Sequence, residues 1–415
     1  MRRVTDYRDV VGDGVVSGIY QKAQRLYGRK IININSVYQG GGVAELLEAL
    51  VPLMNDAGLD ADWRILRGSP DVFTITKKFH NALQGDQINM TEIKKELYLQ
   101  ANEDFAVYAR VEDADCVLIH DPQPLPLIRY YKERQPWLWQ CHVDLSNPNP
   151  ELWRFMKGLI LKYDAVIVSS EKYKRNDLPV EQGIIAPAID PLSSKNMPID
   201  EETIQKRLEK FGVPTDKPII TQISRFDKWK DPEGIIEVFK RVRQKIDCRL
   251  VLCGSMAGDD PEGMEIYESV RKKEGALIGR GDIITIIEEN SILVNALQRV
   301  SAVVIQKSIR EGFGLTVSEA LWKGTPVVAS NAGGIPLQIN DGETGFLLDP
   351  YDIDGFAEKI LWILRNRKEA EEMGKRAREY VRKNFLITRM LGDYLDLFDS
   401  VINRKCHLGK SAANE

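Results

Sequence analysis

The richest cluster of chemically active residues is the string EGFGLTVSEALWKGTPVVAS at residues 311–330. The apolar run before it predicts a strand, so Glu311 falls at the strand end and Glu319 about one turn inside the following helix. Glycines at a strand-to-helix turn let backbone N–H groups approach a ligand, and the N-terminus of the new helix favours phosphate. Two carboxylates beside such a turn suit a ligand that carries both hydroxyl groups and phosphate. The alternative is a plain glycine turn with solvated glutamates, which fits a generic Gly-x-Gly better than it fits this whole string.

Two cations stand close together in IITQISRFDKWKDP at residues 219–232. Arg225 and Lys230 follow an apolar strand pattern, in a loop that ends at Asp231. Together they can neutralise a pyrophosphate, arginine through its forked guanidinium and lysine as a compact charge. They would also stabilise negative charge that develops on a phosphate leaving group. Taken alone they could equally be surface cations beside Asp227 and Asp231, but the neighbouring glutamate pair favours a phosphate site.

A run of three glycines separates a predicted strand from a predicted helix in SVYQGGGVAELL at residues 36–47. It lacks both the Gly-x-Gly-x-x-Gly of dinucleotide sites and the Gly-Lys-Ser/Thr of a P-loop. We interpret it as a loop that lets a substrate come close to the backbone at Gly41 and Gly42. The alternative is a turn that only starts a helix.

Histidine and aspartate end two neighbouring predicted strands. WLWQCHVDLSNPN ends in His142 and Asp144, and VLIHDPQP ends in His120 and Asp121. Polar residues at the carboxyl ends of strands point into the ligand crevice of a doubly wound sheet, where sugars need donors and acceptors. His142 could also stabilise a cationic sugar transition state. A buried core histidine is the alternative, and it weighs more for His120 than for His142.

These residues need a scaffold that gathers strand ends, and the chain alternates short apolar runs with helical stretches. We interpret the following apolar runs as strands: residues 31–37, 61–68, 114–121, 137–144, 164–170, 217–225, 248–255, 302–308, 326–331 and 345–349. Such a βαβ rhythm predicts a parallel, doubly wound sheet with helices on both faces. The rhythm stops in a proline-punctuated loop at residues 184–200 and then restarts. We therefore expect an α/β fold with two Rossmann-like domains, at residues 1–190 and 191–382, with residues 383–415 packing back onto the first. The carboxyl ends of both sheets would face a central cleft.

Size and composition narrow the class of protein. A chain of 415 residues is too long for one ordinary core, and a net charge of −4 argues against a nucleic-acid binder. The five cysteines form no Cys-x-x-Cys pair and have no histidine at zinc-ligand spacing, so we expect reduced thiols. No stretch approaches the ~20 apolar residues that cross a bilayer, and the charged N-terminus lacks the apolar core of a signal peptide. We expect a cytoplasmic protein that binds no membrane.

The motifs together resemble the retaining glycosyltransferases of GT-B-type architecture, the large group with a donor domain like that of glycogen synthase. The motifs around Arg225 and Glu311, and the loop GGGVAE, are specific only to this broad group. Within it, the chain is most similar to the trehalose synthases that join glucose from a nucleoside-diphosphate glucose to free glucose, over about residues 30–400. Five stretches carry that likeness: FHNALQG (79–85), VLIHDPQP (117–124), WLWQCHVDLSNPN (137–149), SRFDKWKDP (224–232) and SIREGFGLTVSEALWKG (308–324).

The resemblance implies roles for particular residues. Four would serve catalysis at the donor phosphate and sugar: Arg225, Lys230, Glu311 and His142. The other donor-binding residues hold the ribose through Glu319 or lie in the two glycine turns: Glu319, Gly312, Phe313, Gly314, Leu315, Gly41 and Gly42. Four polar side chains of the first domain would bind free glucose as the acceptor: His80, Asn81, Gln84 and Asp144. Residues 286–299 would flank the base, where nothing tells adenine from uracil, so ADP-glucose and UDP-glucose both stay open.

The expected reaction is a retaining, reversible glucosyl transfer that makes trehalose with an α,α-1,1 linkage. A retaining glycosidase needs two carboxylates about 5–5.5 Å apart, but no second carboxylate is clearly placed to attack from the opposite face, which favours a front-face route. The diphosphate leaves with help from Arg225 and Lys230, and it takes the proton of the acceptor's anomeric hydroxyl, which attacks from the same side. This scheme requires no cofactor, and no Asp-x-Asp metal motif ends a strand of the donor domain, although magnesium could assist.

Other functions stay open at this point. A retaining trehalose phosphorylase would use inorganic phosphate in the same cationic site, and Glu319 speaks against it because a phosphorylase has no ribose to hold. A non-catalytic sugar- or nucleotide-binding protein is a rival from another class. The set of cations, glutamates and glycines speaks against that rival, since simple binding needs no stabilisation of a leaving group. A transferase with another small acceptor also stays open, and a homodimer is one option for the oligomeric state.

Overall fold

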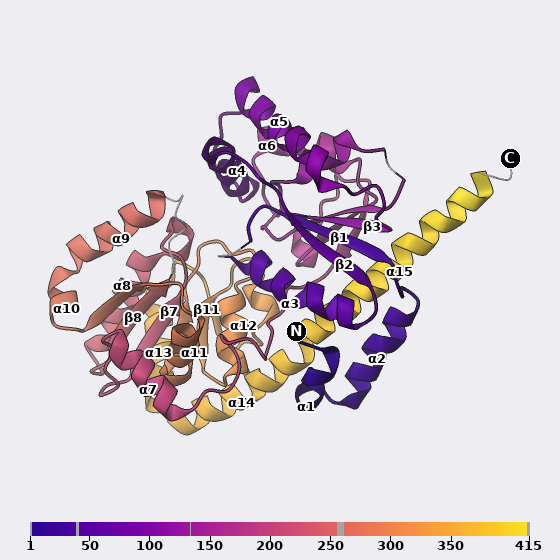
Figure 1. Ribbon diagram of the computed structural model, residues 1–415. Coiled ribbons are helices and arrows are strands. Elements are labelled where there is room, and N and C mark those ends of the chain that lie inside the picture. Colours follow the sequence, from indigo (N-terminus) through magenta and orange to yellow (C-terminus); the bar gives the residue numbers. More distant parts are fainter. Residues whose placement is uncertain (1, 39–40, 133, 255–260, 413–415) are drawn as a thin grey trace. The chain divides into compact units, whose positions relative to one another are not determined.

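The computed structural model describes residues 2–38, 41–132, 134–254 and 261–412, without the side chains of 261–262 and 405–412. The chain forms two compact units, one of Met1–Pro187 with Ile387–Glu415 and one of Ala188–Leu386. Each unit is built on one six-stranded parallel sheet covered by helices (Figure 1). Two Rossmann-like sheets of this kind confirm the predicted fold class.

The sheet of the first unit has the strand order β2-β1-β3-β4-β5-β6, and all of its pairs are parallel. The central strands are almost entirely buried because helices cover both faces, which is why they read as unbroken apolar runs in the sequence. The strands are β1 (Lys30–Asn35), β2 (Asp60–Ile65), β3 (Cys116–His120), β4 (Trp137–Cys141), β5 (Ala165–Val168) and β6 (Glu181–Ile184).

Helices form two layers around this sheet. The contacts among α4, α5 and α6 make one layer, and those among α2, α3 and α15 make the other (Figure 1). Ser69 caps α4 and Asn149 caps α6, each followed by a proline at the first helical position, where proline lacks only a hydrogen bond that the helix would not make. The helices are η1 (Val4–Tyr7), α1 (Arg8–Val11), α2 (Asp13–Gln24), α3 (Gly42–Asp56), α4 (Pro70–Leu83), α5 (Glu92–Ala109), η2 (Leu125–Tyr130), α6 (Pro150–Ile160), η3 (Glu171–Tyr173) and α15 (Ile387–Ala412).

The sheet of the second unit has the strand order β12-β11-β10-β7-β8-β9, again with parallel pairs throughout. The first strand of this unit, β7, therefore lies between β10 and β8. Loops that follow β7 and β10 thus start side by side at one edge of the sheet. The strands are β7 (Ile219–Ile223), β8 (Arg249–Gly254), β9 (Ile283–Ile287), β10 (Val303–Gln306), β11 (Val327–Ser330) and β12 (Phe346–Leu348).

Two separate apolar clusters lie on the two faces of this second sheet. One packs α8 and α13 against the strands, and the other packs α7 and α11. The helices are α7 (Glu201–Lys210), η4 (Lys228–Lys230), α8 (Pro232–Arg243), α9 (Pro261–Lys273), α10 (Gly275–Gly279), α11 (Ser291–Val300), α12 (Leu315–Trp322), η5 (Ile335–Leu337), α13 (Ile353–Arg365) and α14 (Arg367–Asn384).

The second unit is inserted into the first. The chain enters it after Pro187 and leaves it after Leu386, and the last helix, α15, belongs to the first unit. The two ends of the inserted unit meet, because the Ile189 backbone N–H donates to the Phe385 carbonyl oxygen at 2.8 Å. Among the residues that the structure describes, no helix is long and apolar enough to cross a membrane.

Candidate active site

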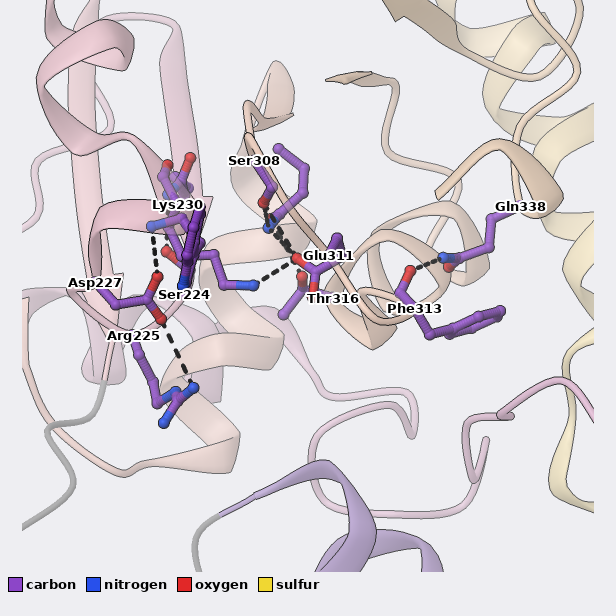
Figure 2. A network of polar contacts seen from close by, with 12 residues as sticks. Ser224, Arg225, Asp227, Lys230, Ser308, Glu311, Phe313, Thr316 and Gln338 are labelled. Atoms are coloured by element: carbon purple, nitrogen blue, oxygen red, sulfur yellow. Dashed lines mark hydrogen bonds and ion pairs between the residues drawn. The ribbon is translucent and has the colours of Figure 1, made fainter. Parts of the chain in front are cut away.

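The loops after β7 and β10 bring a lysine and a glutamate into contact in the second unit. Lys230 Nζ lies 2.6 Å from Glu311 Oε2, and the two side chains are only 15% and 11% exposed (Figure 2). The contact follows from the strand order, because β7 and β10 are neighbours and their carboxyl ends share one edge of the sheet. Two of the residues that sequence analysis assigned to the donor phosphate and sugar therefore form one largely buried ion pair.

Glu311 is held by more than this lysine. Its Oε2 also accepts hydrogen bonds from Gln306 Nε2 at 3.3 Å and from Ser308 Oγ at 3.1 Å. Both donors come from the end of β10 or the residues directly after it. Several donors on one carboxylate hold it in one orientation, so Glu311 fixes the ammonium of Lys230 at the strand end.

Arg225 lies apart from this pair. Its guanidinium points away from Lys230 in Figure 2, and its Nη2 is 3.6 Å from Asp227 Oδ2. The arginine side chain is 45% exposed, whereas Asp227 is buried and accepts the Trp229 backbone N–H at 2.9 Å. The structure thus places Arg225 on the predicted loop, but as an exposed cation without contact to Glu311.

The turn that opens α12 is built closely around Glu311. Gly314 has φ +82°, in the left-handed region that favours glycine, and a Cβ there would lie 3.1 Å from Glu311 Cγ. Gln338 clamps the same turn, since its Nε2 donates to the Phe313 carbonyl at 2.5 Å and its Oε1 accepts the Ser318 backbone N–H at 2.9 Å (Figure 2). The predicted glycine turn at Gly312–Leu315 therefore leads directly into a helix N-terminus, which favours anions. Gln338 was not predicted, because no motif marks it.

Glu319 lies on α12 and is almost fully buried. Its Oε2 lies 3.4 Å from Gln298 Nε2, and its Oε1 lies 3.6 Å from Lys195 Nζ. Behind it, the Lys323 ammonium donates to Gln298 Oε1 at 2.7 Å and to the Glu319 carbonyl at 3.1 Å. Burial lowers the pKa of Lys323 to about 7. Sequence reasoning missed Lys195 because it lies in the proline-punctuated loop, where no pattern reports which side chains turn inward.

The glycine loop of the first unit is described only in part. Gln39 and Gly40 lie outside the described residues, whereas Gly41 has φ +152° and Gly42 begins α3. A Cβ on Gly41 would meet no atom within 4 Å, so the backbone conformation and not crowding favours glycine there. Tyr38 stacks on Trp63 at the other end of the loop, with 5.3 Å between ring centroids.

His142 follows β4 and is fixed through both its backbone and its ring. Its backbone N–H donates to Asp121 Oδ1 at 2.9 Å, and its ring Nε2 lies 3.1 Å from His120 Nδ1. Asp121 has φ +63°, a conformation that a non-glycine residue adopts only when its surroundings stabilise it. Burial lowers the pKa of His142, although the Asp121 carboxylate opposes that shift, and burial lowers the pKa of His120 far more. His120 is therefore a partner of His142 and not only a core residue.

The four predicted acceptor-binding residues come from two segments that the structure brings together. The Asn149 backbone N–H donates to the Ala82 carbonyl at 2.8 Å, and Asn149 Nδ2 donates to the Asp86 carbonyl at 3.2 Å. These bonds tie the end of α4 to the loop that follows His142. On these segments His80 and Asn81 are half-buried, and Gln84 and Asp144 are buried.

The buried carboxylate of Asp144, which is predicted to bind the acceptor, already accepts one hydrogen bond within the protein. Asp144 Oδ1 accepts the Ser146 backbone N–H at 2.8 Å, so that oxygen closes a local turn.

In the part of the chain that the structure describes, no three histidine, cysteine, aspartate or glutamate side chains gather as a metal site would require. Cys116, Cys141, Cys248 and Cys253 are buried and are not in disulfide bonds, and the side chain of Cys406 is not among those that the structure describes.

Two family models match the chain, one for each sheet. Residues 33–175 match a model described as the N-terminal domain of trehalose synthase, and residues 203–380 match one described as glycosyl transferases group 1. The trehalose synthase of Thermococcus litoralis is 47% identical over 96% of this chain and 97% of its own length. The trehalose synthase of Rubrobacter xylanophilus is 41% identical over 97% of each chain. The trehalose phosphorylase of Pleurotus pulmonarius is 28% identical over 91% of this chain but only 58% of its own length.

Solved structures with low sequence identity share the fold. A sucrose-phosphate synthase from Thermosynechococcus elongatus has a TM-score of 0.69 at 20% identity, covering 91% of this chain and 100% of that one. A structure described as "Trehalose-6-phosphate from E. coli bound with UDP-2-fluoro glucose" has a TM-score of 0.72 at 15% identity, covering 89% of this chain and 99% of that one. These likenesses show the two-sheet GT-B fold.

Proposed function

The chain belongs to the trehalose synthase family of the group 1 glycosyltransferases, and on that premise we propose how it works. It makes trehalose by transferring glucose from a nucleoside-diphosphate glucose to free glucose, with retention of the anomeric configuration. We propose that the transfer is also reversible. The observation that carries the proposal is the largely buried Lys230–Glu311 pair beside the N-terminus of α12.

The charges of this site suit a diphosphate leaving group. The Lys230 ammonium and the exposed guanidinium of Arg225 supply two cations after β7, and the N-terminus of α12 adds the positive end of a helix dipole. Preorganised charges of this kind stabilise negative charge that develops in a transition state, and they need no reorganisation during the reaction. Glu311, placed against Lys230, is the acceptor for a hydroxyl of the donor glucose.

The acceptor hydroxyl attacks from the side on which the diphosphate leaves. The bond between the anomeric carbon and the phosphate oxygen breaks first, and the phosphate oxygen then takes the proton of the attacking anomeric hydroxyl. This route needs no carboxylate nucleophile. It requires no cofactor either, since the two cations carry the charge, and magnesium would only assist. His80, Asn81, Gln84 and Asp144 hold the acceptor in this proposal, and Glu319 holds the ribose.

A matrix of donors and acceptors tests the proposal. ADP-glucose and UDP-glucose are each offered with glucose, glucose 6-phosphate and other hexoses, and nucleotide release and the linkage of the product are measured. We expect α,α-trehalose from free glucose, and no efficient transfer to glucose 6-phosphate. Nucleotide-independent breakdown of trehalose that needs inorganic phosphate would instead identify a phosphorylase.

A matched pair of variants tests the role of the ion pair. Lys230→Met should lower kcat/KM about 10²-fold or more, the size expected when one preorganised stabilising charge is lost. Lys228→Met is the control, since it removes the same charge two residues before Lys230. The Lys228 side chain is exposed and lies over the Trp229 ring. Equal activities of the two variants would contradict the assignment of Lys230.

A further inference from the structure

A row of polar side chains crosses three neighbouring strands of the first sheet. Asn33 lies on β1, His120 ends β3 and His142 follows β4, and these strands are adjacent in that order. His120 Nε2 lies 3.2 Å from Asn33 Oδ1, and His120 Nδ1 lies 3.1 Å from His142 Nε2. The two imidazole rings are nearly parallel, with 16° between their planes. Asn33 is 0% exposed and His120 is 2% exposed, so each needs partners within the protein.

The outer end of this row fixes the direction of its hydrogen bonds. Asn33 Nδ2 donates to the backbone carbonyl of Asp62 on β2 at 3.3 Å, and a carbonyl oxygen can only accept. The amide of Asn33 therefore turns its oxygen toward His120. That oxygen also can only accept, so the proton of a neutral His120 must be on Nε2.

The tautomer of His120 determines which ring nitrogen of His142 carries a proton. Neutral imidazole has one N–H and one lone pair, so His120 with a proton on Nε2 offers a lone pair at Nδ1. His142 Nε2 faces that lone pair and must carry a proton to bond with it. Burial lowers the pKa of both histidines, which keeps both rings neutral at pH 7. In neutral His142 the remaining ring nitrogen, Nδ1, is then an acceptor.

We propose that Asn33 and His120 are positioning residues that hold His142 in its Nε2–H tautomer, so that His142 offers Nδ1 as an acceptor to a sugar hydroxyl. The last step rests on the proposed sugar-binding role of His142. An acceptor selects a hydroxyl that donates, whereas the other tautomer would present an N–H and select a different hydrogen-bond pattern. The backbone of the same residue is held separately by Asp121. Ring tautomer and ring position are thus set by different neighbours.

The tautomer itself can be measured without substrate. The chain has four histidines, so ¹⁵N labelling of histidine gives few signals, and variants of single histidines assign them. Protonated and lone-pair ring nitrogens have widely separated ¹⁵N shifts. We expect Nε2–H for both His120 and His142 in the parent, and a loss of the single tautomer in Asn33→Leu, which keeps the branched shape of the side chain but removes the acceptor. A proton on Nδ1 of His142 in the parent would overturn the proposal.

Activity provides the second readout. Asn33→Leu and His120→Leu should each lower kcat about 10- to 100-fold, as expected for loss of orientation at a reacting centre, with much smaller changes in KM. His120→Asn should restore part of this loss, because its amide oxygen can accept the His142 proton again. Gln135→Leu is the matched control, since it removes a buried amide just before β4, at the opposite end of that strand.

The outcomes separate this proposal from the proposed function. If the parent makes no trehalose but the spectra show the Nε2–H tautomer, the function fails and the positioning chain stands. If the parent makes trehalose while Asn33→Leu and Gln135→Leu are equally active, the positioning role fails and the function stands. No recovery in His120→Asn would also count against the hydrogen-bond chain.

Discussion

A fully buried lysine gives the sharpest quantitative prediction for the second unit. Lys307 follows β10, and its side chain is 1% exposed and forms an ion pair with Asp231, whose side chain is 20% exposed. Asp231 begins α8 with φ +47°, and its Oδ1 accepts the Gly234 backbone N–H at 3.1 Å. Because Asp231 follows Lys230 directly, this pair ties the loop after β7 to the end of β10.

The two partners differ in exposure, so their removal should differ in cost. Asp231→Asn keeps the helix cap and tolerates the left-handed backbone, but it leaves a buried ammonium without a carboxylate, which costs about 3–5 kcal/mol. Lys307→Met leaves a carboxylate that still contacts water and the cap N–H, so only one charged hydrogen bond is lost, worth about 1.5–3 kcal/mol. The double variant should be more stable than Asp231→Asn, because no unpaired charge stays buried.

Hydrogen exchange with mass spectrometry measures these costs locally. A loss of 3–5 kcal/mol should speed exchange of amides in α8 and β10 by roughly 10²- to 4 × 10³-fold, since every 1.4 kcal/mol is a factor of ten. Arg241→Gln is the control, since it removes an exposed ion pair between α8 and Asp354 that is worth less than about 1 kcal/mol. If Lys307→Met proved as costly as Asp231→Asn, or if the double variant showed the sum of both losses, the burial argument would be refuted.

Four further changes have expected outcomes. Arg225→Ala should lower kcat/KM about 10²-fold, and near-normal kinetics would remove this residue from the phosphate site. Glu319→Ala should weaken nucleoside-diphosphate binding by roughly 1–3 kcal/mol in calorimetry. Unchanged affinity would show that Glu319 does not bind the ribose. Asn81→Ala should raise the KM for glucose far more than the KM for the donor, and a donor-only defect would move it to the other substrate. Folding lowers the pKa of His120 and of His142. Below the ordinary histidine pKa of about 6.5, the unfolded chain therefore binds more protons than the folded chain. The free energy of unfolding of the first unit should then fall by up to about 1.4 kcal/mol per histidine for each pH unit below that value. Urea titrations at several pH values check this, and an equal pH dependence in a variant without both histidines would contradict it.

The fold could be predicted because most strands are buried on both faces. Such strands are short unbroken apolar runs, as in the WLWQC of β4, and they alternate with helical patterns. The two strands that were missed are both sheet edges. β6 (Glu181–Ile184) has one neighbour and no buried residue, so it carries no apolar signal. β9 (Ile283–Ile287) does carry one in IITII, which sequence analysis left unassigned.

The site could be predicted only at strand ends. Lys230 and Glu311 were predicted as site residues because the βαβ rhythm predicts parallel strands, whose carboxyl ends lie at one edge of the sheet. The adjacency of β7 and β10 comes from the structure. Gln338 and Lys195 were not found, since their contacts depend on how a loop folds over α12. His120 was weighed as a core residue because one sequence cannot report that its ring faces a second imidazole. The substrate roles of the site residues stay predictions until the assays above are made.

The insertion of the second unit sets an order for synthesis on the ribosome. The sheet of the first unit is complete in sequence at residue 187, but α15 covers one of its faces only after residues 188–386 have been translated. At about 5–20 residues per second, that delay lasts roughly 10–40 s. During this time the surface that α15 covers, where Tyr394 later bonds to Gln140, is open to water and to other nascent chains. We therefore expect the nascent first unit to depend on chaperones, and the second unit to fold before the first unit is complete.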